Sequence, residues 1–194
     1  MTFASAKGRR RPARDPGVET LALIDAQGDG GDADPVEVAK QILTRQLAAS
    51  AKSRHQLAQA LAKRSVPDDA AQEALDRYTE LGYVDDSAFA RAWVESRQRS
   101  RGLAASALRR ELREKGIERE LIDQVVSESV SDDDERAAAR LLVEKKLRSM
   151  RGVNSDTATR RLVGMLSRKG YGPGVAYAVV REVLAQSSEP ENTL

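Results

Sequence analysis

Apolar and polar positions along the chain follow a helical period, and the same arrangement of apolar positions occurs three times. Each copy has an apolar pair at i and i+4, one apolar residue in a turn, and four apolar residues at i, i+1, i+4 and i+5, as expected for the buried faces of two successive helices. The second copy lies 51 positions after the first, and the third lies 54 positions after the second. The three copies consist of Leu57, Leu61, Val66, Ala70, Ala71, Ala74 and Leu75; of Leu108, Leu112, Ile117, Leu121, Ile122, Val125 and Val126; and of Leu162, Leu166, Tyr171, Val175, Ala176, Val179 and Val180.

A further helix precedes each copy, so the repeating unit is a trio of helices. Its apolar positions recur with a shift of 51 and then of 48, which leaves six extra residues between the first two helices of the third trio. These positions are Val38, Ala39, Ile42 and Leu43; Phe89, Ala90, Trp93 and Val94; and Ala137, Ala138, Leu141 and Leu142. We therefore predict an all-α protein of three tandem three-helix repeats in an elongated arrangement, straight or curved. The expected segments are an N-terminal arm at 1–34, repeats at 35–84, 85–131 and 132–186, and a tail at 187–194.

Residues that start and stop helices support these boundaries. Asp34 followed by Pro35 is typical of an N-cap with proline at the first helical position, and Ser53 with Gln56 predicts a capping box. Glycines also fall where helices must end, as expected for C-terminal caps. These glycines are Gly82, Gly102, Gly116 and Gly170.

Two adjacent carboxylates, Asp85 and Asp86, precede the first helix of the second trio. They align with Asp34 in the first trio and with Asp133 in the third, so every trio has an aspartate at this place. An aspartate there accepts hydrogen bonds from free backbone amides and faces the positive end of the helix dipole, which contributes about 1 kcal/mol. We therefore predict that Asp34, Asp85 and Asp133 are helix caps. The alternative is a carboxylate pair for acid–base chemistry or for magnesium, which no nearby lysine, histidine or glycine-rich phosphate loop supports.

Composition narrows the chemistry that the chain can perform. Hydrophobic residues make up 40% of the chain, aromatic residues 4% and charged residues 32%, which favours helices over a sheet. Cysteine is absent and His55 is the single histidine, so thiolate catalysis, disulfides and multi-histidine metal sites are excluded. We expect no enzyme activity, no metal and no cofactor. Phe89 and Trp93, spaced i, i+4, are interpreted as core residues rather than as a surface for base stacking.

The N-terminal segment differs from the rest of the chain in its charge. Residues 1–14 hold five bases and no acid, whereas residues 15–37 hold seven acids and no base. Because such a segment has little apolar surface to bury, we expect a flexible arm, in which RRRPAR is either a solvated tail or a weak nucleic-acid contact. The sequence has no apolar run near the roughly 20 residues that span a bilayer and no apolar signal-peptide region, so we predict a cytoplasmic protein without membrane contact.

Charge along the repeats is unevenly distributed, although the formal net charge is only +2. The first two helices of a trio are basic: residues 38–64 hold six bases and no acid, and residues 136–169 hold ten bases against two acids. The third helix of a trio is acidic or weakly charged, with five acids and one base at 67–80. Stacked trios would align their basic helices into a cationic strip, for which the alternative is a set of ordinary solvated helix faces. The hypothesis is that the strip docks an acidic polymer, either nucleic acid or an acidic protein filament.

The candidate binding residues are bases of the second and third trios, chosen by charge and repeat position alone. They are Arg97, Arg99, Arg101, Arg109, Arg110, Arg113 and Lys115 in the second trio, and Lys145, Lys146, Arg148, Arg160, Arg161, Arg168 and Lys169 in the third. Replacing Arg109, Arg110 and Arg113 by alanine is expected to weaken partner binding and to flatten its salt dependence.

The run from Gly82 to Ile117, GYVDDSAFARAWVESRQRSRGLAASALRRELREKGI, resembles the signature of the RecX family, bacterial regulators of the RecA recombinase. The family's middle repeat has a glycine, an aliphatic residue and two aspartates before a helix with Phe-Ala, then an Arg-Gly turn, and Leu-x3-Leu leading into Lys-Gly-Ile. The matching residues are Gly82, Val84, Asp85, Asp86, Phe89, Ala90, Arg101, Gly102, Leu108, Leu112, Lys115, Gly116 and Ile117. The resemblance covers about residues 36–186, and the N-terminal arm and the longer connection in the third trio depart from it.

The resemblance implies tandem three-helix repeats and a small non-enzymatic protein that binds RecA filaments on single-stranded DNA. Such a protein would modulate, and mainly inhibit, filament growth, ATP hydrolysis, strand exchange and coprotease activity, in DNA repair, homologous recombination and the SOS response. The implied partner is the RecA filament, with weak binding to single- or double-stranded DNA, and we expect a monomer. The alternative is a direct DNA-binding protein in which a trio acts as a helix-turn-helix.

Overall fold

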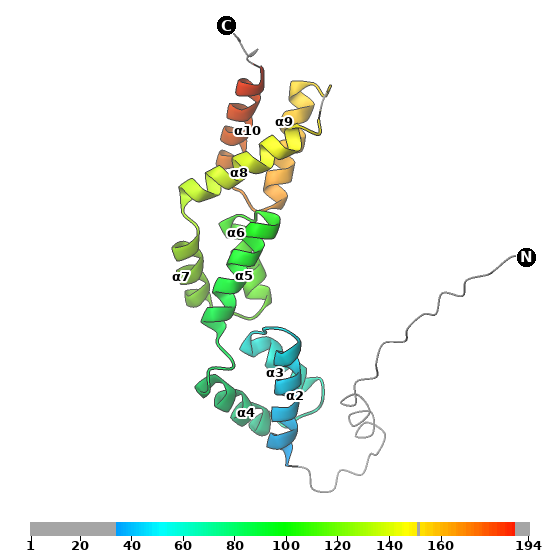
Figure 1. Ribbon diagram of the computed structural model, residues 1–194, viewed down its shortest axis with the longest axis vertical. Coiled ribbons are helices and arrows are strands. Elements are labelled where there is room, and N and C mark those ends of the chain that lie inside the picture. The colour runs from blue at the N-terminus through cyan, green and yellow to red at the C-terminus, as the bar shows by residue number, and fades with distance from the viewer. Residues whose placement is uncertain (1–33, 151, 189–194) are drawn as a thin grey trace, which may run out of the picture. The chain divides into compact units, whose positions relative to one another are not determined.

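The computed structural model describes residues 34–150 and 152–188, and within them the structure confirms the predicted all-helical fold. Nine helices form three groups of three in this part of the chain, and no strand occurs there (Figure 1). With the labels of Figure 1, the helices are α2 (Pro35–Ala49), α3 (Arg54–Ala62) and α4 (Asp68–Glu80); α5 (Asp86–Arg101), α6 (Ala105–Glu114) and α7 (Arg119–Ser129); and α8 (Asp132–Leu147), α9 (Ser155–Arg168) and α10 (Pro173–Ser188). The predicted arm lies outside the described residues apart from Asp34, as does most of the predicted tail.

Each group of three helices encloses its own apolar core, as the repeated spacing predicts. The apolar pair of each middle helix is fully buried in its core: Leu57 and Leu61 on α3, Leu108 and Leu112 on α6, and Leu162 and Leu166 on α9. Full burial of one such side chain contributes about 1.5–3 kcal/mol. The most extensive helix packing occurs within a group, so each repeat is largely stabilised by its own three helices.

The first helix of the third repeat differs from the predicted register by one residue. The buried residues of α8 are Ala139 and Val143, which take the places of Ala90 and Val94 on α5. The shift between these two helices is therefore 49 rather than 48, and Leu141, predicted to face the core, is 67% exposed. The prediction failed because three consecutive alanines allowed either register, since alanine suits buried and exposed helix positions alike.

Successive middle helices meet end to end. The C-terminal end of α6 meets the first turn of α3, where Ser53 Oγ donates a hydrogen bond to Lys115 O at 2.6 Å. The C-terminal end of α9 meets the first turn of α6 in the same way, and there Ala104 N donates to Lys169 O at 3.0 Å. Polar groups that a helix leaves free at its ends are thus satisfied by the neighbouring repeat.

Two glycines make this close approach possible. Gly170, after α9, has a φ of +91°, and a Cβ there would lie 2.7 Å from the backbone N of Ala107. Gly116, after α6, has a φ of +75°, and a Cβ there would lie 2.2 Å from Cγ of His55. Any other residue at either position would be strained, both by the positive φ and by the close contact of its Cβ. The equivalent position in the first repeat is Ser65, which has a φ of +56° and is exposed.

Polar side chains cap one helix in each of the first two repeats, α3 and α5. The capping box predicted from Ser53 and Gln56 is present at the start of α3. Asp85 is the N-cap of α5, and its Oδ1 accepts a hydrogen bond from Ala88 N at 2.9 Å. Asp34 lies directly before α2, and its capping role stays a prediction.

The cap predicted at Asp133 is wrong. Helix α8 begins at Asp132, and its N-cap is Ser131, whose Oγ accepts a hydrogen bond from Asp134 N at 3.1 Å. Asp133 lies in the first helical turn, where its charge is favourable to the helix dipole. The helix starts earlier than expected because serine and the following aspartates suit a cap and a first turn respectively.

Candidate partner-binding groove

Some of the predicted binding arginines form ion pairs with acids of their own repeat. The pairs are Arg97–Glu111, Arg101–Glu111, Arg109–Asp123 and Arg99–Glu95. The side chain of Arg101 is 56% exposed and that of Arg97 only 27%. Acids therefore interrupt the predicted strip on the second repeat. The exposed pair Arg99–Glu95 leaves both charges accessible to a partner, whereas the pair Arg97–Glu111 is mostly covered.

Two bases cover the ring of Trp93. The guanidinium of Arg97 lies 3.9 Å from the ring centroid, and Lys115 Nζ lies 4.7 Å from it. The indole N–H donates to Glu111 at 3.0 Å, and the other neighbour is the ring of Phe89, 5.7 Å away. The core prediction is right for buried Phe89, whereas Trp93 is only half-buried. Arg97 and Lys115 thus contribute to packing of the second repeat, by about 0.5–2 kcal/mol for each cation–π contact.

A hollow of about 600 Å³ lies where α5, α8 and α9 meet, at the junction of the second and third repeats. Bases line it and no acid does; they are Arg99, Arg101, Lys145, Lys146 and Lys169. Its apolar lining consists of Ala138, Leu141, Leu142 and Met165. The hollow therefore combines charge of one sign with apolar surface.

A second hollow of about 640 Å³ continues the first along α9, and the two share Lys146 and Met165. It adds Arg160, Arg161 and Arg168, again without an acid. We call the two hollows together the cationic groove. The predicted binding residues that line it are Arg99, Arg101, Lys145, Lys146, Arg160, Arg161, Arg168 and Lys169.

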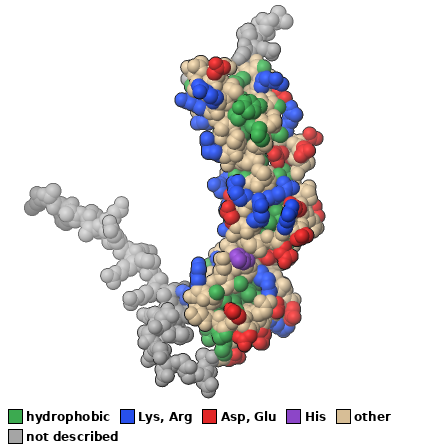
Figure 2. All heavy atoms as spheres, turned by 180° about the vertical axis from the view of Figure 1, so that it is seen from behind, with side chains coloured by type: hydrophobic (Ala, Val, Ile, Leu, Met, Phe, Trp, Pro, Cys, Tyr) green, Lys and Arg blue, Asp and Glu red, His purple; other side chains and the backbone are tan. Residues whose placement is uncertain are grey.

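Charges of the cationic groove act on one another. Burial lowers the pKa of Lys169, and the nearby charges of Arg101 and Lys145 lower it further. Lys145 and Lys146 form no ion pair with an acid among the described residues. Figure 2 shows clusters of Lys and Arg side chains on one face of the repeats, with Asp and Glu gathered mainly toward one edge. The bases of the cationic groove repel one another, and an anionic partner in the groove would relieve this repulsion.

The end of α5 is fixed in position by contacts with the third repeat. Gly102 is the C-cap of α5 with a φ of 57°, and its carbonyl accepts a hydrogen bond from Tyr171 Oη at 3.2 Å. The ammonium group of Lys169 donates to Arg101 O, and Leu142 packs against Gly102. Bases from two repeats are thus held around one hollow.

Other predicted residues lie outside the cationic groove. They are Arg97, Arg109, Arg110, Arg113, Lys115 and Arg148. Arg110 and Arg113 are exposed on α6, and Arg148 lines a different hollow together with Glu144. The binding role of these six residues stays a prediction.

The predicted register of α8 concealed the junction contact of Glu135 and the exposure of Leu141. Glu135 Oε2 accepts a hydrogen bond from Ala105 N at 3.0 Å, across the junction of the second and third repeats. Asp86 Oδ1 does the same for Arg54 N, at 2.8 Å, across the preceding junction. The corrected shift of 49 aligns Asp86 with Glu135, so the correct register would have revealed both the shared role and the exposure of Leu141.

The adjacent carboxylates Asp85 and Asp86 therefore have separate partners: one caps α5, and the other binds the first turn of α3. Over residues 34–150 and 152–188, no group of three or more His, Cys, Asp or Glu is arranged to hold a metal ion.

No helix within residues 34–150 and 152–188 is both long and apolar enough to cross a membrane.

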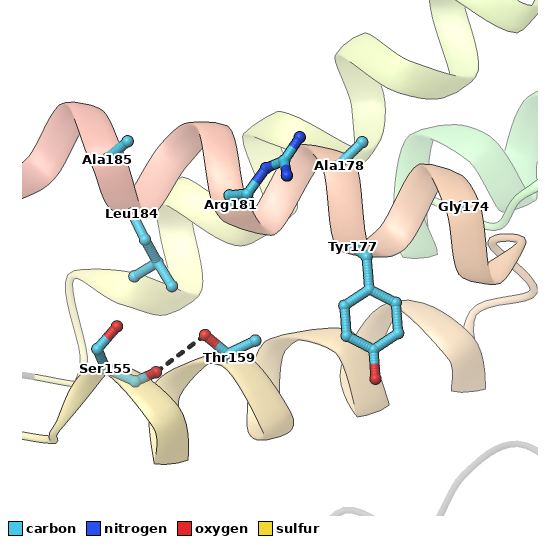
Figure 3. Close-up of a pocket in the computed structure, with 8 residues that line it drawn as sticks. All are labelled: Ser155, Thr159, Gly174, Tyr177, Ala178, Arg181, Leu184 and Ala185. Carbon is cyan, nitrogen blue, oxygen red and sulfur yellow. Dashed lines mark hydrogen bonds between the residues drawn. The ribbon is translucent and has the colours of Figure 1, made fainter.

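A separate hollow of about 670 Å³ lies between α9 and α10 (Figure 3). Tyr177 and Leu184 point from α10 toward α9, where Thr159 Oγ1 donates to Ser155 O at 2.9 Å. Arg181 is the one charged residue in its lining. This hollow lacks the concentration of charge that distinguishes the cationic groove.

Comparison with known proteins identifies the family. Models of the first, second and third RecX three-helix domains match residues 39–77, 85–126 and 133–180. A protein of Streptomyces coelicolor named Regulatory protein RecX is 51% identical over 156 residues, which cover 80% of this chain and 82% of the relative. The chain belongs to the RecX family. A RecX protein of Thermobifida fusca is 43% identical over 158 residues, covering 80% of this chain and 85% of the relative.

Solved RecX structures share the fold. The crystal structure of RecX from Lactobacillus salivarius has a TM-score of 0.71 at 15% identity and covers 79% of this chain and 99% of that one. Another crystal structure of a regulatory protein RecX has a TM-score of 0.68 at 18% identity, with 84% and 87% covered. Identities this low show the fold alone, whereas the RecX relatives above support a regulatory role for this chain.

Proposed function

We propose that the chain binds RecA filaments on single-stranded DNA and restrains filament growth, ATP hydrolysis, strand exchange and coprotease activity. The observation that carries the proposal is the cationic groove, in which bases and no acid line two adjoining hollows. Membership of the RecX family supports the choice of partner. We further propose that the chain acts in the cytoplasm as a monomer and catalyses no reaction.

Bases of the cationic groove come from two repeats, so a bound partner would contact both at once. Once one contact forms, the others are intramolecular, and several weak contacts together give tight binding. A protein bound across neighbouring RecA protomers would hold them in one arrangement. It would thereby oppose the conformational changes that filament growth and ATP hydrolysis require. Charge contacts of this kind weaken with salt, so inhibition should decline as ionic strength rises.

The six predicted bases outside the groove are proposed to contribute less. Arg97 and Arg109 are engaged by Glu111 and Asp123, and Lys115 lies over Trp93. Moving these side chains to a partner would lose the contacts that they make within the second repeat.

The test is to add the purified chain to preformed RecA filaments and to follow ATP hydrolysis and filament length. The expected result is slower hydrolysis and shorter filaments, with weaker binding to bare single-stranded DNA than to filaments. Unchanged hydrolysis and length would contradict the proposal. Tight, sequence-specific binding to duplex DNA at physiological salt would instead favour the helix-turn-helix alternative.

A further inference from the structure

The cationic groove contains an apolar stripe on one face of α8. The stripe consists of Ala138, Leu141 and Leu142, which line the first hollow together with Lys145. The spacing of these four residues, i, i+3, i+4 and i+7, places them on the same side of the helix. Leu141 is 67% exposed and lines the same hollow as five bases, so its apolar side chain is available to a partner that these bases attract. Met165 of α9, a flexible side chain that adapts to different partners, adjoins this stripe.

The chemistry of the lining distinguishes between two kinds of acidic polymer. Single-stranded nucleic acid is bound by bases along its backbone together with aromatic side chains on which its bases stack. Neither hollow of the cationic groove has an aromatic side chain in its lining. Aliphatic side chains beside lysines and arginines are complementary instead to a peptide that carries both apolar and acidic side chains.

We infer that the first hollow of the cationic groove binds an acidic protein segment with one apolar face, in the manner of an amphipathic helix in a groove. Leu141 and Met165 contact the apolar face, while Lys145 and Lys146 bind the flanking carboxylates. The inference rests on the proposed function, because it assigns this hollow to a protein surface of the filament and not to its DNA.

The bases lie where such a segment needs them. Lys145 and Lys146 are in the last turn of α8, and Arg99 and Arg101 are in the last turn of α5. Acidic residues of the partner would thus meet bases from two helices beside the apolar stripe. The hollow of about 600 Å³ has room for the side chains of a short helical segment rather than for a whole domain.

A peptide-binding experiment tests the inference directly. The probes are a labelled helical peptide with leucines on one face and glutamates elsewhere, a scrambled peptide of the same composition without an apolar face, and oligothymidylate. The variant is Leu141→Ser, which removes the exposed apolar side chain, and the matched control is Tyr177→Ser, at a residue 60% exposed in the hollow between α9 and α10. Both positions are exposed, so both variants are expected to fold.

The amphipathic peptide should bind the unaltered chain more tightly than the scrambled peptide does. Leu141→Ser should weaken binding of the amphipathic peptide by about tenfold and change oligothymidylate binding by less than about twofold, while Tyr177→Ser changes neither. The inference is overturned by equal affinity for the two peptides, or by Leu141→Ser leaving peptide binding unchanged or weakening oligothymidylate equally.

Inhibition of RecA ATP hydrolysis separates failure of the inference from failure of the proposed function. If the unaltered chain inhibits hydrolysis and Leu141→Ser inhibits equally well, the groove does not use its apolar stripe and the inference is wrong. If the unaltered chain does not inhibit at all, the proposed function is wrong, and the peptide measurements still decide what the groove binds.

Discussion

The two junctions between repeats are built on the same plan but are crossed by different numbers of hydrogen bonds. Between the first and second repeats, two hydrogen bonds cross: from Ser53 Oγ to Lys115 O and from Arg54 N to Asp86 Oδ1. More cross between the second and third repeats. Their donors and acceptors are Ala104 N and Lys169 O, Ala105 N and Glu135 Oε2, Ser106 Oγ and Gly170 O, Lys169 Nζ and Arg101 O, and Tyr171 Oη and Gly102 O.

The junction that is crossed by more hydrogen bonds is also the one that forms the cationic groove. Arg101 and Lys169 belong to both the groove and the junction. Their side chains line the first hollow, and their backbone carbonyls accept hydrogen bonds across the junction. A binding surface made from two repeats has a fixed shape only if the repeats are fixed relative to each other, and such preorganisation reduces the entropy lost on binding. Under the proposed function, the second junction has the additional role of fixing the shape of the cationic groove, whereas the first junction connects two repeats.

The largest expected effect comes from Gly170→Ala. The added Cβ would meet the backbone N of Ala107, and the alanine would have to adopt a positive φ. We therefore expect the free energy of unfolding, measured by urea denaturation, to fall by about 3 kcal/mol. Gly82→Ala is the control, because Gly82 has a φ of +74° with no atom near its Cβ position. It should lose only about 1 kcal/mol. Equal losses would mean that the close approach at the second junction is not tight.

Alkaline pH should loosen the second junction selectively. Burial, and to a smaller extent the charge of Glu135, raises the pKa of Tyr171 to about 12. The folded state thus favours the neutral phenol, and its stabilising contribution is complete below about pH 10 and is lost as the pH rises toward about 12. We expect a loss of about 2 kcal/mol from this group, measured as the difference in pH dependence between the unaltered chain and Tyr171→Phe. Parallel curves for the two proteins would contradict the assignment.

Removing the acids that cross the junctions should have smaller and unequal effects. Helix α6 has no side-chain cap of its own, so Glu135→Ala leaves Ala105 N without its partner and should cost about 1.5 kcal/mol. Helix α3 keeps the Ser53 capping box, so Asp86→Ala should cost less than about 1 kcal/mol. Thermal unfolding of both variants provides the comparison. A larger loss for Asp86→Ala would reverse the proposed order of the two junctions.

The smallest effect is expected at Ser65. It occupies the place of Gly116 and Gly170, but it is exposed and carries a side chain at a φ of +56°. Ser65→Gly should relieve this backbone strain and raise the free energy of unfolding by about 0.5 kcal/mol. A loss of stability instead would show that the serine side chain has a role at this end of the repeats.

The repeat architecture was predictable from sequence because its signals are local. The spacing of Leu57 and Leu61 and of their counterparts defines a buried helix face, and Ser53 with Gln56 defines a helix start, without knowledge of distant residues. Such signals recur in each repeat, so one repeat supports the interpretation of the next. Register failed only in α8, where consecutive alanines carry no information about which side is buried.

The cationic groove was only partly predictable, because it depends on contacts between residues that are distant in the sequence. Charge and repeat position selected Lys145, Lys146 and Lys169, which the structure brings to one hollow. They did not reveal that Glu111 binds Arg97 and Arg101, since ion pairs between helices depend on packing geometry and not on spacing along one helix. The apolar part of the groove was hidden by the same register error.

The central claim is that the cationic groove, and not the whole basic surface, binds the filament. The most direct measurement compares two doubly charge-reversed chains with the unaltered chain as inhibitors of RecA ATP hydrolysis. One carries Lys145→Glu and Lys146→Glu in the groove, and the other carries Arg110→Glu and Arg113→Glu, at exposed positions outside it. The groove variant should need at least about tenfold more protein for half-inhibition, and the other variant less than about threefold more. Equal losses in the two variants, or no loss in the groove variant, would contradict the account.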